Sequence, residues 1–243
     1  MTTSLARLQN FYGELSAQLL LDAMIKQEFA GGIAMLTSFG ADAGLLLGMV
    51  AEVDRETPVL FLDTGKHFPE TLAYGRVLEK FFGLRNVRWL TPDSQMIENT
   101  DRDGNLWKTQ PNRCCWLRKV DPLNRAIEEM GLLALITGRK RYQTPERANM
   151  QTIELDENGV FRINPFAHWS RADSIKETAQ REIPSHPLTA QSYRSIGCAP
   201  CTLPVNTNQD DRAGRWVHTI GIENEQKTEC GLHVPASAMN WSV

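Results

Sequence analysis

Five cysteines are the side chains of this 243-residue sequence with the greatest capacity for chemistry. Cys114 and Cys115 are adjacent, and Cys198 and Cys201 have the CxxC spacing that lets two sulfurs approach one metal centre. Two ligand pairs far apart in a chain commonly close a four-thiolate site. Adjacent cysteines are rarer as co-ligands and are also found as buried apolar side chains. The pattern predicts metal binding and leaves zinc and iron–sulfur open.

The fifth cysteine, Cys230, lies in the polar segment KTECGLH. A reactive thiol must ionise, and Lys227 and His233 are the neighbouring groups that could favour a thiolate. The alternative is an exposed cysteine without a role. In a reducing cytoplasm, five cysteines fit four metal ligands and one nucleophile better than they fit disulfides.

Two polar turns follow predicted buried strands. Residues 38–42 (SFGAD) precede a helix, so their backbone amides and the positive helix end suit an anion. Residues 63–65 (DTG) lie at the end of the next strand, and ligands of open α/β sheets collect where parallel strands end. Each turn could also be an ordinary connection without a ligand. The pair together favours a nucleotide pocket.

Basic side chains are grouped near the cysteine pair, after a predicted strand and near the C-terminus. Bidentate arginine contacts suit sulfate and phosphate oxygens, although most charges on a protein are simply solvated. The grouping therefore fits a small dianionic substrate. Its members are Arg113, Arg118, Lys119, Arg139, Lys140, Arg141, Arg147, Arg212 and Arg215.

Strands that alternate with helices position these residues and predict an α/β fold with an open, mostly parallel sheet flanked by helices. A predicted hairpin and a helix opened by Ser170 and Asp173 follow the last parallel strand. The segment 92–113 is polar and without periodicity. Helices are expected at 4–28, 43–53, 69–84 and 114–130, parallel strands at 33–38, 58–65, 86–90 and 132–138, and hairpin strands at 151–155 and 160–163.

Composition limits the partners. The formal net charge of −3 gives no general attraction to nucleic acid or to an anionic membrane. Polar residues interrupt every apolar stretch near the N-terminus before it reaches the length of a signal peptide core or a membrane span, so we expect a cytoplasmic protein. The sequence of the last forty or so residues predicts a polar tail.

Motifs across residues 37–233 resemble the phosphoadenylyl- and adenylyl-sulfate reductases of assimilatory sulfate reduction, a step toward cysteine biosynthesis. The segments that carry the resemblance are TSFGADAG, LDTGKHFPET, CCWLRKVDPL, TGRKRYQTPERA, NPFAHW, SHPL, SYRSIGCAPCT, RAGRW and KTECGLH. The four-cysteine pattern is similar to that of the adenylyl-sulfate branch, which binds a 4Fe-4S cluster. The resemblance implies a sheet of the adenine-nucleotide alpha-hydrolase type.

The resemblance also implies roles for individual residues. Cys114, Cys115, Cys198 and Cys201 would hold the cluster, and residues 203–243 would form a mobile catalytic tail on a reductase domain of residues 1–202. Cys230 would attack the sulfur of adenylyl sulfate, release AMP and carry an S-sulfocysteine until thioredoxin or glutaredoxin releases sulfite, with His233 as the second catalytic residue. The implied substrate-binding residues are Ser38, Phe39, Gly40, Asp63, Thr64, Gly65, Lys119, Arg139, Arg141, Arg212 and Arg215.

Alternatives remain at this point. No motif reports on a 3'-phosphate, so a phosphoadenylyl-sulfate (PAPS) or dual-substrate reductase is the nearest alternative. A zinc-containing ATP-dependent thiolation enzyme and a zinc-stabilised nucleotide-binding module are others, although Ala43 stands where ATP-using relatives have a second serine. Which of Arg139, Lys140 and Arg141 meets phosphate is open. We also expect a homo-oligomer.

Overall fold

In the computed structural model, which describes residues 4–220, 222, 227 and 229–233, six strands form one sheet in the order β3-β2-β1-β4-β6-β5. Every pairing is parallel except the β5–β6 hairpin, which is antiparallel. The predicted open, mostly parallel α/β sheet is confirmed. The strands are β1 Ile33–Thr37, β2 Val59–Leu62, β3 Val87–Leu90, β4 Ala134–Ile136, β5 Ile153–Leu155 and β6 Phe161–Ile163.

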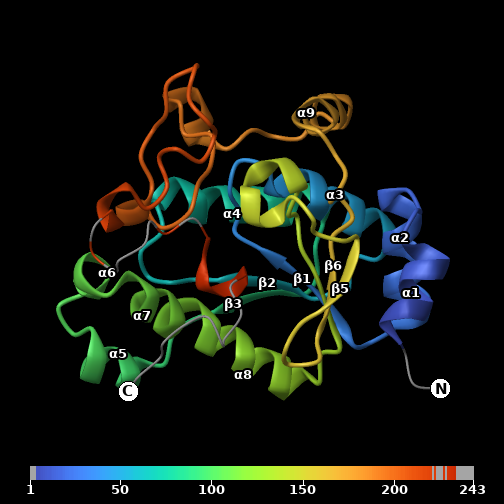
Figure 1. Cartoon of the computed structure of the whole chain (residues 1–243), viewed down its shortest axis with the longest axis horizontal. Helices are drawn as coiled ribbons and strands as arrows, with labels where there is room; N and C mark the ends of the chain where they lie inside the picture. Colours follow the sequence, from blue (N-terminus) through green and yellow to red (C-terminus); the bar gives the residue numbers. More distant parts are fainter. Residues whose placement is uncertain (1–3, 221, 223–226, 228, 234–243) are drawn as a thin grey trace.

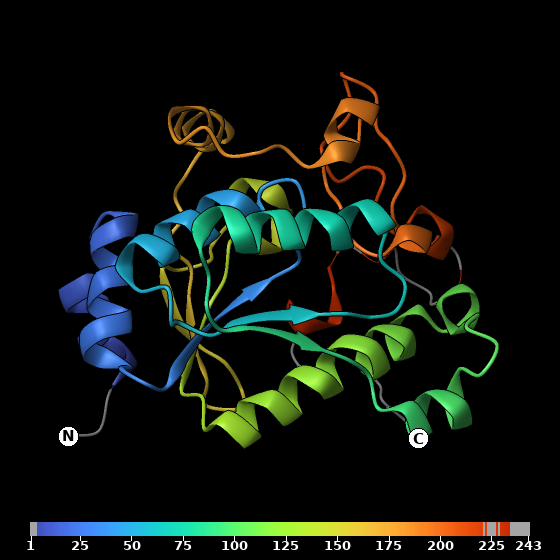
Figure 2. The same cartoon turned by 180° about the vertical axis from the view of Figure 1, so that it is seen from behind.

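Helices cover both faces of the sheet (Figure 1), and the view from behind shows the same layers (Figure 2). Helices α3 and α4 lie on one face, α7 and α8 on the other, and α1 and α2 stand at the β5 end. None of the described helices is long and apolar enough to cross a membrane. The α-helices are α1 Leu5–Tyr12, α2 Ala17–Ala23, α3 Ala43–Val53, α4 Pro69–Phe82, α5 Ser94–Thr100, α6 Leu106–Thr109, α7 Pro111–Cys115, α8 Asp121–Met130 and α9 Arg171–Gln180.

Shorter helical turns, labelled η, connect these elements. Two are π-type and the rest are 3₁₀. One of them, η6, directly follows Cys198, which forms an isolated bridge with His67 in the segment after β2. They are η1 Met24–Glu28, η2 Trp116–Val120, η3 Arg141–Gln143, η4 Pro145–Arg147, η5 Pro187–Gln191, η6 Ala199–Cys201, η7 Val217–Thr219 and η8 Gly231–His233.

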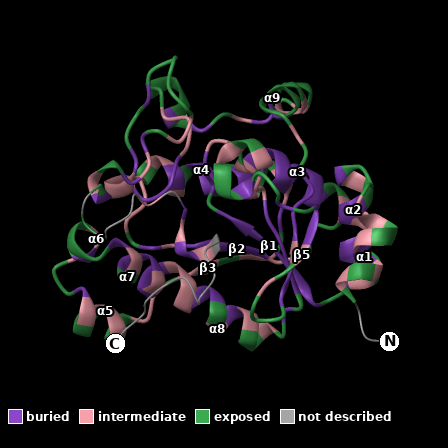
Figure 3. Cartoon of the chain, in the orientation of Figure 1, coloured by how far each residue is buried: buried purple, intermediate pink, exposed green. Residues whose placement is uncertain are grey.

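The core lies on both faces of the central strands because successive side chains of a strand point to opposite faces. Met35 packs into the cluster under α3 and α4, whereas Leu36 packs into the cluster beside α8. Figure 3 shows this burial along the sheet and on the inner sides of the helices. An apolar run buried on both faces is typical of parallel strands, which explains why these strands could be predicted.

Local signals at helix ends behave as expected. Pro69 occupies the first turn of α4 with Glu70 beside it, and Gly83 ends the helix at φ +62°. Ser170 and Asp173 form a capping box at α9, with hydrogen bonds of 3.1 and 2.8 Å. The predicted helix opened by Ser170 and Asp173 is confirmed, and it ends at Gln180.

Two helical predictions differ from the structure. The helix expected over 4–28 is divided into α1, α2 and η1, because Gly13 caps α1 and the chain turns before α2 begins. The break also leaves Leu15 exposed, so the apolar stripe is not continuous. The segment 92–113 contains α5, α6 and part of α7. Asp93 starts α5 by accepting a hydrogen bond from the Met96 amide, a cap that periodicity does not reveal.

His186 is a buried neutral histidine that makes folding stability depend on pH. Its Nδ1 accepts from the Leu188 amide at 3.1 Å and its Nε2 lies 3.0 Å from the Thr71 hydroxyl. Burial lowers the pKa of His186 to about 4. Since an unfolded histidine titrates near 6.5, the unfolded chain binds the extra proton between these values.

We therefore expect folding stability to fall as pH decreases from about 6.5 toward 4. The His186→Gln variant should be less stable at neutral pH but should lose stability less steeply across this window. Chemical denaturation at several pH values measures both slopes. An imidazole NMR signal of His186 that titrates near 6.5 would contradict this account.

Candidate active site

A cavity of about 810 Å³ lies where the parallel strands end. It is bounded by the turn after β1, the loop after β4, one side of α9 and the segment carrying Cys230. Positively charged side chains gather on its wall, which suits an anionic ligand. They are Lys119, Arg139, Arg147, Arg171, Arg194, Arg212 and Arg215.

The turn after β1 contributes small groups to this cavity. Ser38 and Gly40 line it, and a side chain at position 40 would place its Cβ 3.0 Å from the Ile196 carbonyl oxygen. A larger residue here would therefore have to push the Ile196 backbone back by a few tenths of an ångström. Phe39 instead points into the core, where its ring lies 4.8 Å from Phe61 and 5.7 Å from Trp89.

The turn after β2 faces the cysteines. None of Asp63, Thr64 and Gly65 is among the described residues that line the cavity. Asp63 accepts a hydrogen bond from the Gly65 amide at 3.1 Å, and the Thr64 hydroxyl lies 3.3 Å from the Cys198 sulfur. This turn therefore supports the cysteine site, and its expected part in the nucleotide pocket stays a prediction.

Cys114, Cys115, Cys198 and Cys201 all line one small pocket beside the cavity. In the described residues, no three His, Cys, Asp or Glu side chains converge on a single point that could hold one metal ion. Burial raises the pKa of Cys114 to about 11 and of Cys201 to about 12, so a bound metal would have to favour their thiolates. The four cysteines on one pocket are residues that could hold a metal centre.

A buried ion pair holds the helix that carries the cysteine pair. Arg118 donates to Asp101 through Nε at 3.1 Å and Nη2 at 2.6 Å, and its Nη1 donates to the Thr64 carbonyl at 2.8 Å. Both side chains are almost fully buried. Arg118 therefore fixes η2 against the turn after β2, and its charge is used within the fold.

Lys119 and Arg215 line both the cavity and the cysteine pocket, so they form a shared wall. Burial opposes the charge of Lys119, but the sulfurs of Cys198, Cys230 and Cys115 outweigh it and raise its pKa. The ammonium group therefore stays charged between the cysteine pocket and the space open to a substrate.

Cys230 lines the cavity and is absent from the lining of the cysteine pocket. A hydrogen bond from the Cys115 thiol, together with the charges of Lys119 and Lys227, holds the pKa of Cys230 well below its usual range despite burial. The Lys227 ammonium in turn contacts the Asn112 side chain. Cys230 thus has the environment of a reactive thiolate.

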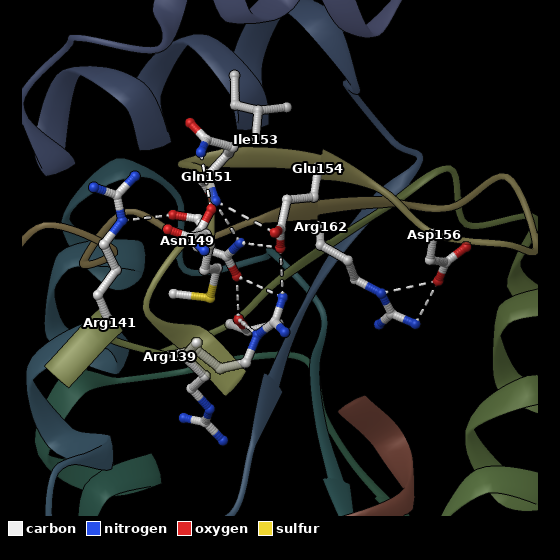
Figure 4. A network of polar contacts seen from close by, with 12 residues as sticks. Arg139, Arg141, Asn149, Gln151, Ile153, Glu154, Asp156 and Arg162 are labelled. Atoms are coloured by element: carbon white, nitrogen blue, oxygen red, sulfur yellow. Dashed lines mark hydrogen bonds and ion pairs between the residues drawn. The ribbon is translucent and has the colours of Figure 1, made fainter. Parts of the chain in front are cut away.

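The three basic residues after β4 have different surroundings, and Figure 4 shows those of Arg139 and Arg141. Arg139 lines the cavity and its Nη2 donates to Glu154 at 3.0 Å. Arg141 donates to the Met150 carbonyl at 2.7 Å and does not line the cavity. Lys140 is 1% exposed and pairs with Asp42 at 3.3 Å. Arg139 is therefore the member of this group that lines the cavity.

The basic residues near the C-terminus also reach the cavity. Arg212 lies 3.6 Å from Glu229, and burial together with Arg215 lowers the pKa of Arg212 to about 10, so it remains charged at neutral pH. Arg215 lies over the Trp216 ring at 4.4 Å and donates to the Ser195 hydroxyl at 3.3 Å. The backbone of His233 is in η8, and its side chain lies outside the described part of the structure.

Two further residues of the site were not singled out from the sequence. His67 lines the cavity, and burial next to Lys119 lowers the pKa of His67 to about 4, so it is neutral there. Glu229 is a buried carboxylate on the cavity wall. His67 lies in the motif LDTGKHFPET and Glu229 in KTECGLH, so the motifs indicated that both positions are near the site. A lone histidine and a lone glutamate did not indicate a particular role.

Removing one cationic group from the cavity wall should reduce catalysis far more than stability. A charge-assisted contact is typically worth about 1.5 to 3 kcal/mol, so we expect Lys119→Ala, Arg212→Ala and Arg215→Ala each to lower kcat/KM roughly tenfold to a hundredfold. Arg113→Ala is the matched control, because Arg113 is exposed on α7 and lines neither pocket. Steady-state rates at limiting substrate measure the effect, and near-normal rates would make these charges simple surface charges.

The fold and the site together define an α/β protein with a cysteine on the wall of a cationic cavity. The sequence of residues 32–204 matches the phosphoadenosine phosphosulfate reductase domain. The chain is 43% identical over 225 residues to the adenosine 5'-phosphosulfate reductase of Chelativorans sp. (strain BNC1), covering 92% of this chain and 88% of that protein. It is 40% identical to adenosine 5'-phosphosulfate reductase 1 of Bacillus subtilis (strain 168), covering 81% and 82%.

A solved structure agrees with the fold. The phosphoadenylyl-sulfate reductase of Candida auris, crystallised as a phosphate complex, superposes with a TM-score of 0.70 at 24% identity, covering 84% of this chain and 99% of that one. The chain therefore belongs to the phosphoadenosine phosphosulfate reductase domain family. It is an enzyme that reduces a sulfur-containing substrate.

Proposed function

We propose that this enzyme reduces adenylyl sulfate to sulfite and AMP, with Cys230 as the nucleophile and a dithiol protein, thioredoxin or glutaredoxin, as the electron donor. The observation that carries the proposal is the position of Cys230 on the wall of the cationic cavity, next to Lys119. Curated relatives named for adenosine 5'-phosphosulfate support the substrate.

In the first step, the Cys230 thiolate attacks the sulfur of adenylyl sulfate. A sulfur–sulfur bond forms, the bond from sulfur to the phosphate oxygen breaks, and AMP leaves with that electron pair. Lys119, Arg139 and Arg215 line the cavity and would balance the charge on the sulfate and phosphate oxygens. The product on the protein is an S-sulfocysteine.

In the second step, a thiolate of the donor attacks the Cys230 sulfur and sulfite leaves with the electron pair of the sulfur–sulfur bond. The second donor thiol then resolves the mixed disulfide and restores the Cys230 thiol. The donor dithiol is oxidised to a disulfide and the sulfonate is reduced to sulfite. His233 remains the proposed second catalytic residue of this segment.

We further propose a 4Fe-4S cluster at Cys114, Cys115, Cys198 and Cys201. All four thiols line one pocket, and thiolates are the usual ligands of such clusters. When bound, the cluster would place an additional charged, redox-capable group next to Lys119. It would also join α7 to the turn that carries Cys198.

The proposal also includes the domain boundaries, the nucleotide-binding residues, the cellular location and the assembly of the protein. We assign the nucleotide-binding and cluster-binding domain to residues 1–202 and the catalytic tail to residues 203–243. Ser38, Phe39, Gly40 and the turn at 63–65 are proposed to surround the nucleotide through backbone or side-chain groups. We also propose a cytoplasmic homo-oligomer.

Product analysis with two substrates tests the function. Anaerobically purified enzyme with reduced thioredoxin should convert adenylyl sulfate to equal amounts of AMP and sulfite. Activity with phosphoadenylyl sulfate should be much lower. A higher kcat/KM for phosphoadenylyl sulfate would assign the enzyme to the other substrate, and ATP hydrolysis without sulfite would overturn the proposal.

A further inference from the structure

Glu229, the residue before Cys230, is a buried carboxylate held by an arginine from a distant loop. The Arg147 guanidinium donates to it twice, through Nε at 2.6 Å and Nη2 at 2.7 Å. The Thr144 hydroxyl donates a third hydrogen bond at 2.9 Å. Both charged side chains are less than 10% exposed.

Among the described carboxylates that line this cavity, Glu229 is the buried one. Its charge repels an anionic substrate, and it occupies Arg147 in the bidentate arrangement that a sulfate or phosphate would otherwise use. Burial also opposes its ionisation, yet the Arg147 guanidinium holds the pKa of Glu229 below its usual range. A buried charge pair is weak evidence for added stability, so its position next to the nucleophile is the more informative fact.

The pair fixes the backbone of the nucleophile. Neighbouring Cα atoms are about 3.8 Å apart, so anchoring Glu229 limits where Cys230 can lie. Two other contacts hold the same segment: Lys227 binds the side chain of Asn112, and Leu232 packs on the core cluster beside α8. Of these three anchors, the Arg147 pair and Leu232 both line the substrate cavity, and the Arg147 pair is the charged one of the two.

We propose that Glu229 is a positioning residue, whose ion pair with Arg147 and hydrogen bond from Thr144 dock Cys230 against the cavity for the sulfur-transfer step. The proposal rests on the proposed function. Docking serves the attack on the nucleotide substrate, whereas the later attack by a donor thiol needs Cys230 to be reachable from outside. The ion pair should therefore matter for the first half-reaction and not for the second.

Glu229→Gln tests this with little change in side-chain size. Rapid-quench single turnover at saturating adenylyl sulfate should show AMP release slowed at least tenfold. The KM should not rise, because the variant removes a negative charge from an anion site; a collapsed cavity would raise it. Once the adduct has formed, a small dithiol should release sulfite from wild type and variant at equal rates.

Matched variants separate the pair from general effects. Glu56→Gln also removes a carboxylate from an ion pair, with Arg85 at 3.0 Å, but on the exposed surface, and should change neither half-reaction. Glu229→Asp should recover part of the rate. Arg147→Gln combined with Glu229→Gln should be no slower than the slower single variant, because both remove the same interaction.

Hydrogen exchange tests the docking of residues 229–233 separately from the proposed reaction. Amide exchange in residues 229–233 should be faster in Glu229→Gln than in wild type without any substrate present. If wild type forms no adduct, the proposed function fails while this measurement still reports on docking. Unchanged exchange, unchanged AMP release, or equal slowing of both half-reactions would overturn the positioning role.

Discussion

The Cys230→Ser variant should produce no sulfite from adenylyl sulfate. A serine hydroxyl is not ionised near neutral pH, and the charges that lower the thiol pKa cannot make it a comparable nucleophile. We expect turnover to fall by about a thousandfold or more. The nucleotide should still bind with near-normal affinity, because most of the cavity wall comes from other segments.

Mass spectrometry locates the intermediate. Wild-type enzyme incubated with adenylyl sulfate and no donor should release one AMP per chain and gain one sulfonate on a peptide that contains Cys230. Reduced thioredoxin should then release sulfite from that adduct. The Cys230→Ser protein should show neither event, and a sulfonate on any other residue would disprove the role of Cys230.

The sequence was sufficient for the sheet because its parallel strands are apolar runs followed by polar turns. Met35 and Leu36 point to opposite faces and are both buried, so the pattern needed no long-range information. The helix caps at Pro69 and Ser170 were local in the same way. The break at Gly13 was not predicted, since one glycine inside a periodic stretch is often tolerated.

The arrangement of the candidate site could not be predicted from local sequence patterns, because it depends on contacts between residues far apart in the chain. The contact between Cys115 and Cys230 joins positions 115 residues apart, and the ion pair of Arg147 with Glu229 spans 82. Within the segment 139–141, the sequence alone could not show which of the three basic residues lines the cavity. Their difference arises because Lys140 turns inward to Asp42 while Arg139 lines the cavity.

Replacing a cluster ligand should have the second large effect. Anaerobically purified wild-type enzyme should be brown and contain about four iron and four sulfide per chain. Serine at Cys114, Cys115, Cys198 or Cys201 should bleach the protein, whereas Cys230→Ser should keep its colour and its iron. Colourless wild-type protein with one zinc would replace the cluster by a zinc site.

Cys115 gives the strictest test of the predicted ligand set. Its thiol lines the cysteine pocket and also forms a hydrogen bond with Cys230, so it could serve either group. A ligand thiolate carries no proton to donate, so cluster binding would leave Lys119 and Lys227 to stabilise the Cys230 thiolate. Cys115→Ser should therefore lose iron to the same extent as Cys198→Ser, measured by absorbance and iron analysis. A brown Cys115→Ser protein with slowed AMP release would instead make Cys115 a partner of the nucleophile and leave the cluster with three cysteine ligands.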